Sequence, residues 1–461
     1  MQKQTSWAAL TVSLMIAPVL VLGACGDKEK EVKSSDGDKE IAFPSTYSPP
    51  DSQPTLITNA YVLDGIGGEF ENANVLIVDG KIAGVGADVS SDAEGLVTID
   101  AQGAWVTPGV IDSHSHLGVY ASPSVRAHSD GNEATSPNTA ELSSEHGVWP
   151  QDPGFSEALA GGVTTLHVLP GSANLFGGKG TTLRNIPSRT VQGMKMPGAP
   201  ATLKMACGEN PKRVYGQKGG PASRMGNFAH YRKHWIKAQG YKKKLDAGEL
   251  KPGDRNLQLE TLAGVLSGDI LVQMHCYRAD EMAQVLDMAK EFDYKVSSFH
   301  HSVEAYKIGD LLKENDTCSA MWADWWGFKM EAYDGIQENI PFVHAQGACA
   351  LIHSDSGYGI QRLNQEIAKA YGHGKRAGID ISKGEAWKWI AINPAKAIGI
   401  DDQTGSLETG KRADVVIWSG DPFSTYTKAD KVFLDGALMY DRLAGLKPIS
   451  DFRLGQPGTG E

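Results

Sequence analysis

Long hydrophobic runs are missing from this sequence after residue 30, and its 461 residues include only five cysteines. A helix that spans a bilayer needs about 20 apolar residues, so we expect no membrane span in the body of the chain. Basic residues are scarce relative to acidic ones, 44 against 55, which gives a net charge of −11. This acidic surplus argues against nucleic acid and against an anionic membrane surface as partners.

Nucleophilic and nucleotide-binding motifs are missing as well. Neither a Gly-x-Ser-x-Gly turn nor a glycine-rich nucleotide loop stands in a suitable context. The cysteines do not indicate a function either. They could form disulfides if the protein is exported, but their spacing in the sequence does not give the pairing. After the N-terminal segment, each cysteine is expected to act as a small buried hydrophobic residue. These four are Cys207, Cys276, Cys318 and Cys349.

The composition is that of a globular protein with an ample core. Hydrophobic residues make up 41% of the chain and charged residues 21%. The length exceeds the roughly 100–200 residues typical of one domain. We therefore expect one large domain and a smaller one.

The first 25 residues have the pattern of an export segment. Lys3 supplies positive charge, residues 7–22 are mostly apolar, and Leu-Gly-Ala-Cys25 follows. The segment resembles the lipobox of bacterial lipoproteins, which implies that Cys25 is acylated and becomes the mature N-terminus. Residue 26 is Gly rather than the Asp of inner-membrane retention, so the resemblance implies a lipid-anchored protein that faces the periplasm, at the outer rather than the inner membrane. An ordinary signal peptide and a buried helix are the alternatives. Residues 26–53 are typical of a flexible tether.

Both ends of the mature chain carry short β patterns. Residues 54–106 contain apolar runs separated by Asp79-Gly80, a hairpin turn. Residues 403–445 repeat this pattern, with a strand expected at Ala413–Trp418. The sequence therefore predicts a small β-sandwich domain that is built from both ends.

Residues 107–402 alternate apolar strands with amphipathic helices. The helix expected at Asp280–Phe292 has apolar residues at i, i+3, i+4 and i+7, and it follows an apolar strand. This alternation predicts an α/β fold whose length suits a (β/α)8 TIM-like barrel, with an open doubly wound sheet as the alternative. Residues 205–260 are rich in Lys and Gly and are expected to be a long insertion that shapes a substrate pocket.

Potential metal ligands gather at the predicted strand ends. His114 and His116 follow an apolar run, and residues i and i+2 of a strand face the same side. Catalytic groups of a parallel barrel sit at the C-terminal ends of its strands. All five strand ends that can be placed carry such a side chain, although the chain has only 13 histidines. Beyond the first pair they are Lys204, His275, His300-His301 and His353-Ser-Asp355. Nitrogen and oxygen ligands of this kind suit zinc.

With these motifs the sequence resembles the amidohydrolase superfamily, in particular an imidazolonepropionase-like and Xaa-Pro-dipeptidase-like branch. The resemblance runs over about residues 56–439. Four stretches carry it: Val106–His116, Gly161–Thr165, Ile352–Ser356 and the tail from Asn393 to Ile417. It implies the (β/α)8 barrel, the composite β-sandwich and metal-dependent hydrolysis of a C–N bond in an amide, cyclic amide or peptide.

The resemblance also implies a ligand set when it is carried over residue by residue. Asp355 matches the carboxylate that binds metal and shuttles the proton. His301 is preferred over His300 because it directly precedes Ser302. The matched histidine ligands are His114, His116, His275 and His301.

Lys204 decides how many metal ions are expected. It matches by position the lysine that CO2 carboxylates in binuclear relatives, where it bridges two metal ions. Glu209 is the alternative bridging residue, and a mononuclear site would need neither. The expected cofactor is therefore one or two Zn²⁺ ions, or another divalent metal.

A hydrolytic mechanism follows from these roles. Zinc lowers the pKa of bound water toward about 7. Asp355 then accepts the proton and later donates it to the leaving nitrogen. His167 ends another strand and is expected either to contact substrate or to pack as a structural residue.

Two other functions remain open. Deaminases of the superfamily usually have Glu at the position of Arg278, which weighs against deamination. The other is a non-catalytic lipoprotein that binds a metal or a small molecule. Such a protein would more naturally have lost Asp355 or one of the metal-binding histidines, and none of them is missing. We expect a small-molecule or dipeptide substrate, no nucleic acid, and membrane contact only through the lipid anchor, and we leave a homo-oligomer open.

Overall fold

A computed structural model describes residues 43–325, 327–446 and 454. The predicted export segment, Cys25 and most of the predicted tether lie outside the described residues. From Pro44 on, the chain forms one unit, to which the following description applies. Within the described part, no helix combines the length and the apolar character that crossing a membrane requires.

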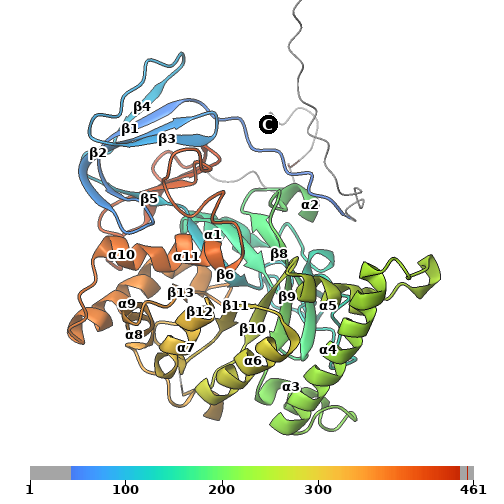
Figure 1. Cartoon of the computed structure of the whole chain (residues 1–461). Coiled ribbons are helices and arrows are strands. Elements are labelled where there is room, and N and C mark those ends of the chain that lie inside the picture. The colour runs from blue at the N-terminus through green and yellow to red at the C-terminus, as the bar shows by residue number, and fades with distance from the viewer. Residues whose placement is uncertain (1–42, 326, 447–453, 455–461) are drawn as a thin grey trace, which may run out of the picture. The chain divides into compact units, whose positions relative to one another are not determined.

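Eight strands form a nearly closed barrel (Figure 1). Neighbouring strands follow one another in chain order from β6 to β13. Their bounds are β6 Val110–Ser115, β7 Val163–Val168, β8 Phe176–Arg184, β9 Ala201–Ala206, β10 Ile270–His275, β11 Val296–His300, β12 Cys318–Met321 and β13 Ala350–Ile352. The predicted barrel is thus confirmed, and the open doubly wound alternative is wrong.

One strand departs from the parallel arrangement. β8 runs antiparallel to both β7 and β9, whereas the other neighbouring pairs are parallel. Residues 169–175 join β7 to β8, and a parallel return needs a crossover of about a dozen residues or more. The glycine-rich sequence of β8 lacks the apolar pattern by which the other barrel strands are recognised.

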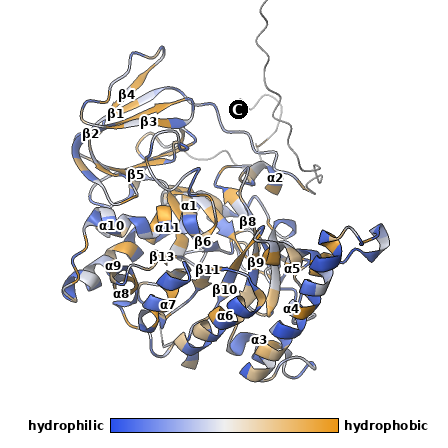
Figure 2. Ribbon diagram, viewed as in Figure 1, coloured by the Kyte–Doolittle hydropathy of each residue, from blue (hydrophilic) through white to orange (hydrophobic). Residues whose placement is uncertain are grey.

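Helices cover the outside of the barrel, and the hydrophobic strands occupy its centre (Figure 2). In α6, Met282, Val285, Leu286 and Ala289 are buried, in agreement with the predicted apolar face. The helices outside the insertion are α1 Pro153–Ala160, α2 Val191–Met194, α6 Ala279–Phe292, α7 Gly309–Glu314, α8 Asn339–Ala345, α9 Leu363–Arg376, α10 Lys383–Trp387 and α11 Ile392–Ala397.

The segment after β9 is helical rather than irregular. It contains α3 (Glu209–Tyr215), α4 (Arg224–Asp246) and the start of α5 (Leu257–Ser267). Ser223 caps α4 because its hydroxyl accepts a hydrogen bond from the Gly226 N–H. This helical segment connects β9, which carries Lys204, to β10, which ends at His275.

A second sheet combines strands from both ends of the chain, as the sequence predicts. Its order is β16-β15-β14-β5-β1-β2-β3, with β4 beside β1, and Figure 1 shows blue and red strands in the same sheet. The antiparallel pair β14–β5 joins the two ends of the chain. The bounds are β1 Thr55–Leu63, β2 Glu69–Val78, β3 Lys81–Gly86, β4 Val97–Asp100, β5 Trp105–Pro108, β14 Val415–Trp418, β15 Ala429–Leu434 and β16 Ala437–Asp441.

The four described cysteines form two disulfides, so their predicted role as separate buried hydrophobic residues is wrong. Cys207 is bonded to Cys276, with an S–S distance of 2.02 Å, and Cys318 is bonded to Cys349 at 2.10 Å. Cys207 and Cys276 directly follow β9 and β10, whose parallel register places Ala206 opposite His275. Each cysteine of this pair therefore faces the other, which becomes evident only once that register is known.

Candidate metal centre

His114 and His116 converge at the end of β6. Their Nε2 atoms lie 3.3 Å apart, which agrees with the same-face spacing of residues i and i+2. His114 is fully buried, and His116 is partly buried. Which nitrogen of each ring carries its proton decides what this pair can bind.

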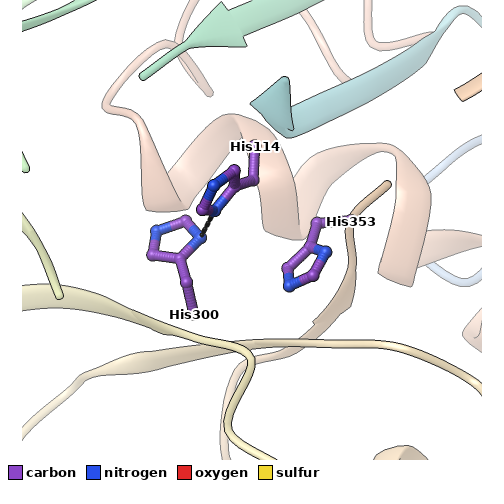
Figure 3. A group of neighbouring side chains, drawn as sticks. All are labelled: His114, His300 and His353. Atoms are coloured by element: carbon purple, nitrogen blue, oxygen red, sulfur yellow. Dashed lines mark hydrogen bonds between the residues drawn. The ribbon is translucent and has the colours of Figure 1, made fainter. Parts of the chain in front are cut away.

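A chain of hydrogen bonds fixes the proton on His114. Gln273 donates from Nε2 to the Ala397 carbonyl at 2.8 Å, so its Oε1 accepts from Nε2–H of His300 at 2.7 Å. Burial lowers the pKa of His300 well below its usual value, and its Nδ1 therefore carries a lone pair. His114 must then donate from Nδ1 across the 2.9 Å contact to His300 (Figure 3). The Nε2 lone pair of His114 is left facing the site.

His116 is held in the equivalent state by the backbone. Its Nδ1 lies 2.8 Å from the Leu169 carbonyl oxygen, which can only accept, so Nδ1 is the protonated nitrogen. In the neutral ring, Nε2 therefore offers a lone pair towards Nε2 of His114. Two lone pairs 3.3 Å apart repel each other unless a proton or a metal ion lies between them.

Asp355 completes this group of ligand atoms. Its Oδ1 lies 3.1 Å from Nε2 of His116 and 3.6 Å from Nε2 of His114, and its Oδ2 lies 3.7 Å from Nε2 of His301. Burial raises the pKa of Asp355, but its contacts with His116, His353 and Lys204 outweigh the effect of burial, so the pKa is lowered. Asp355 is therefore ionised and negative at neutral pH.

Two of the candidate ligands have a left-handed backbone conformation. Asp355 has a φ of 50° and His301 a φ of 61°, both in the left-handed region that residues other than glycine rarely adopt. The Asp355 N–H donates to the His114 carbonyl at 3.0 Å, which holds the strained residue against β6. Strain of this kind persists where surrounding structure enforces it, most often at functional sites.

Lys204 reaches the cluster from β9. Its Nζ lies 3.2 Å from Nε2 of His114 and donates to the Pro170 carbonyl at 3.0 Å. Burial lowers the pKa of Lys204 to about 7, although the charge of Asp355 opposes the shift. Glu209, the alternative bridging residue, instead pairs with Lys329 at 3.4 Å.

Three further histidines surround the cluster. Burial lowers the pKa of His275 and His301 well below the usual value, and that of His353 to about 4. All three are neutral imidazoles, the form that binds metal. Among the described residues, the Nδ1 atom of each is buried without a hydrogen-bond partner. Buried nitrogens without a hydrogen-bond partner, next to converging ligand atoms, are consistent with a site that binds a metal ion.

Two overlapping groups of side chains have ligand atoms close enough to share one ion. One is His114, His300 and His353, drawn in Figure 3. The other is His114, His116 and Asp355. In the first group, both nitrogens of His300 are already hydrogen-bonded to the protein. The second group alone offers unprotonated ligand atoms that face one another.

Asp112 is a supporting residue that the sequence reasoning misses. Its Oδ1 accepts from the backbone N–H groups of His114 and Ser354, both at 3.1 Å, and its Oδ2 accepts from the Ser354 hydroxyl. Burial raises its pKa to about 6. Asp112 thereby joins β6 to the end of β13, the two strands at the open ends of the barrel sheet. It stands two residues before His114, and this same-face spacing is the clue in the sequence.

Both ring nitrogens of His167 lie within hydrogen-bond distance of threonine hydroxyls, which favours the structural one of the two roles that the sequence leaves open. It is fully buried, with Nδ1 2.9 Å from the Thr182 hydroxyl and Nε2 2.8 Å from the Thr202 hydroxyl. Burial lowers its pKa to about 3. Both nitrogens serve the packing of β7 against β8 and β9, the structural alternative that the sequence left open.

Comparison with known proteins agrees with this fold. The amidohydrolase family model matches residues 333–446. A solved amidohydrolase from Thermotoga maritima is 34% identical with a TM-score of 0.77, and the match covers 84% of this chain and all of that one. The chain belongs to the amidohydrolase family.

Two curated relatives show how far the likeness extends. Amidohydrolase tasK of Hapsidospora irregularis is 29% identical over 84% of this chain, but the match covers only 43% of tasK. The imidazolonepropionase of Mesorhizobium japonicum is 24% identical over 78% of this chain and 90% of its own length. The chain thus spans less than half of the first relative and most of the second.

Proposed function

We propose that this protein is a metal-dependent hydrolase that cleaves a C–N bond in an amide, cyclic amide or peptide. The observation that carries the proposal is the pair of inward lone pairs on His114 and His116, with the Asp355 carboxylate beside them. A cation is the simplest group that satisfies all three. Family membership supports hydrolysis as the reaction.

His114, His116 and Asp355 would hold the first ion. Beside them, His301 Nε2 lies 3.7 Å from Asp355 Oδ2, and the His275 ring packs against that of His301. Zinc suits such nitrogen and oxygen ligands. Zinc held by these residues would supply a hydroxide at neutral pH and polarisation of the scissile carbonyl. The hydrogen bonds from His114 to His300 and from His116 to Leu169 orient the two rings, as outer partners do in metal sites.

Asp355 is the proposed proton carrier. It is ionised at neutral pH, and a quarter of its side chain is exposed, so it can receive a proton from the attacking water. The water oxygen then forms the new C–O bond. When the C–N bond breaks, Asp355 returns the proton to the leaving nitrogen. No serine or cysteine nucleophile is required.

Lys204 determines whether a second ion is held. A neutral amine reacts with CO2 to give a carbamate, forming an N–C bond and releasing one N–H proton to solvent, and burial of Lys204 favours the neutral amine. The resulting carboxylate would be able to bridge two ions, whereas the unmodified amine would leave a single ion. The metal content of Lys204→Ala separates the two cases: loss of both ions supports the bridge, and a single ion that is unaffected by the substitution excludes it.

The activity itself is tested with the purified metal-loaded protein. We expect hydrolysis of at least one compound among N-acyl amino acids, dipeptides and cyclic amides, with loss of the rate on chelation and recovery with zinc. Release of ammonia from an aminated heterocycle, without cleavage of any amide, would instead identify a deaminase. Folded, metal-loaded protein that turns over none of these compounds would contradict the proposal.

We also propose that the protein is exported and anchored through Cys25. Two disulfides support an oxidising compartment, where such bonds form and persist. Cys25→Ser is expected to release the protein from the membrane fraction. Continued anchoring of that variant would contradict the lipid anchor.

A further inference from the structure

An aromatic side chain lies directly on one of the candidate ligands. Trp322, the residue after β12, stacks on the His301 ring with 4.5 Å between centroids and 24° between planes. Its indole N–H donates to the Ser354 carbonyl at 3.2 Å, which fixes the ring orientation. One face of the metal centre is therefore apolar and rigid.

The aromatic surface continues outward from Trp322. Trp325 stacks on Trp322 at 5.5 Å, and Phe328 meets Trp322 edge-on at 5.8 Å. Trp325 is 43% exposed and Phe328 57% exposed, so two large aromatic side chains of a kind that is usually buried are accessible to solvent. Contiguous exposed aromatic surface of this kind marks a binding region.

Tyr277 and Lys329 hold the other side of this surface in place. The Tyr277 ring lies 6.2 Å from that of Phe328 and 4.9 Å from the ring of His275. The ammonium of Lys329 sits 4.0 Å above the Tyr277 ring and donates to Asn210 Oδ1 at 3.3 Å. The aromatic side chains are thus anchored to the ends of β10 and β12 without a ligand.

We propose that Tyr277, Trp322, Trp325 and Phe328 form a subsite for an aromatic or similarly flat apolar group of the substrate. Because Trp322 touches His301, such a group would lie next to the bond that is cleaved. The inference rests on the proposed function and narrows its substrate class. Flat apolar groups are favoured because offset stacking and edge-on contacts between rings add binding free energy that an aliphatic chain does not gain.

The test compares matched substrates on the metal-loaded protein. N-phenylacetylglycine and N-acetylphenylalanine place a ring on either side of the amide, and N-acetylglycine has none. We expect kcat/KM to be about tenfold or more higher for at least one ring-bearing compound, as one stacking contact with its buried area allows. In the double variant Trp325→Ala/Phe328→Ala, the ratio of ring-bearing to ringless kcat/KM should approach one.

A control removes an exposed ring elsewhere. Tyr426 is 91% exposed and lies in the loop before β15, so Tyr426→Ala should keep the wild-type ratio. Turnover-free binding is checked by calorimetry with 3-phenylpropionate against propionate, and the double variant should lose the preference for the ring.

The outcomes separate this inference from the proposed function. Hydrolysis without any preference for rings, or a double variant that lowers all rates equally, overturns the subsite and leaves the hydrolase intact. Binding of 3-phenylpropionate that depends on Trp325 and Phe328, in a protein that hydrolyses no amide, supports the subsite and overturns the hydrolase. Assembly of copies through this surface, abolished by the double variant, would also overturn the subsite.

Discussion

His300→Phe tests the hydrogen-bond chain that orients His114. The substitution keeps a flat ring of similar size but removes the Nδ1 acceptor that lies 2.9 Å from Nδ1 of His114. Both residues are fully buried, so water does not replace the lost acceptor. The Nδ1–H of His114 would be left unpaired, and its ring would lose the orientation that directs Nε2 into the site.

The expected magnitude follows from two independent considerations. A buried donor without its partner costs about 1–3 kcal/mol. Loss of an outer hydrogen-bond partner lowers metal affinity by about 10–100-fold, which corresponds to about 1.4–2.8 kcal/mol. The first range applies to the stability of the fold, with or without metal, and the second to metal binding. The dissociation constant for zinc should therefore rise by about 10–100-fold while binding persists.

Competition with a chromophoric chelator measures this constant, and His167→Phe is the matched control. His167 is equally buried, but its nitrogens bond to Thr182 and Thr202 rather than to a candidate ligand. The control should lose thermal stability and keep its zinc affinity. An unchanged affinity in His300→Phe would refute the orienting chain. Complete loss of binding would make His300 a direct ligand, which contradicts the deduced proton positions.

Three further predictions follow from the same geometry. Asp355→Asn should lower kcat/KM by about 10²–10⁴-fold in the loaded enzyme, as loss of an acid–base group does; a full rate would exclude Asp355 as the proton carrier. Burial lowers the pKa of Lys204 from 10.5 to about 7, so between these values the unfolded chain binds the extra proton. The stability of the metal-free protein should therefore rise with pH over this window in thermal melts, and an equally steep rise in Lys204→Met would contradict the assignment. Removal of the Cys207–Cys276 disulfide, which closes a separation of 69 residues, should destabilise the fold by about 4 kcal/mol in denaturant titrations; a midpoint unaffected by Cys207→Ala/Cys276→Ala would argue that the bond does not form.

Much of the fold is predictable because it depends on periodicity. The apolar face of α6 and the hairpin turn Asp79-Gly80 are local patterns, and both occur where the sequence places them. β8 escapes prediction because its glycines interrupt the apolar pattern, and its direction depends on the short connection from β7. Disulfide pairing likewise depends on the register between β9 and β10, which no local pattern encodes.

The candidate site is predictable only in part, for a related reason. The positions of His114, His116 and Asp355 at strand ends predict that they lie close together, and in the structure their ligand atoms do. The role of His300 depends on which nitrogen faces Gln273, and that requires the packing of β10 against β11. His167 has the same strand-end position in sequence, yet neighbouring threonines occupy both its nitrogens.

The metal content of the purified full chain is the most decisive measurement for the proposed centre. Elemental analysis should find one or two equivalents of zinc, or of another divalent ion, per folded wild-type chain. His114→Ala/His116→Ala should remain folded and lose that metal, because the substitution removes the two facing lone pairs. A wild-type protein that hydrolyses its substrate without metal, or a double variant that keeps its full complement, would contradict a metal centre at these residues.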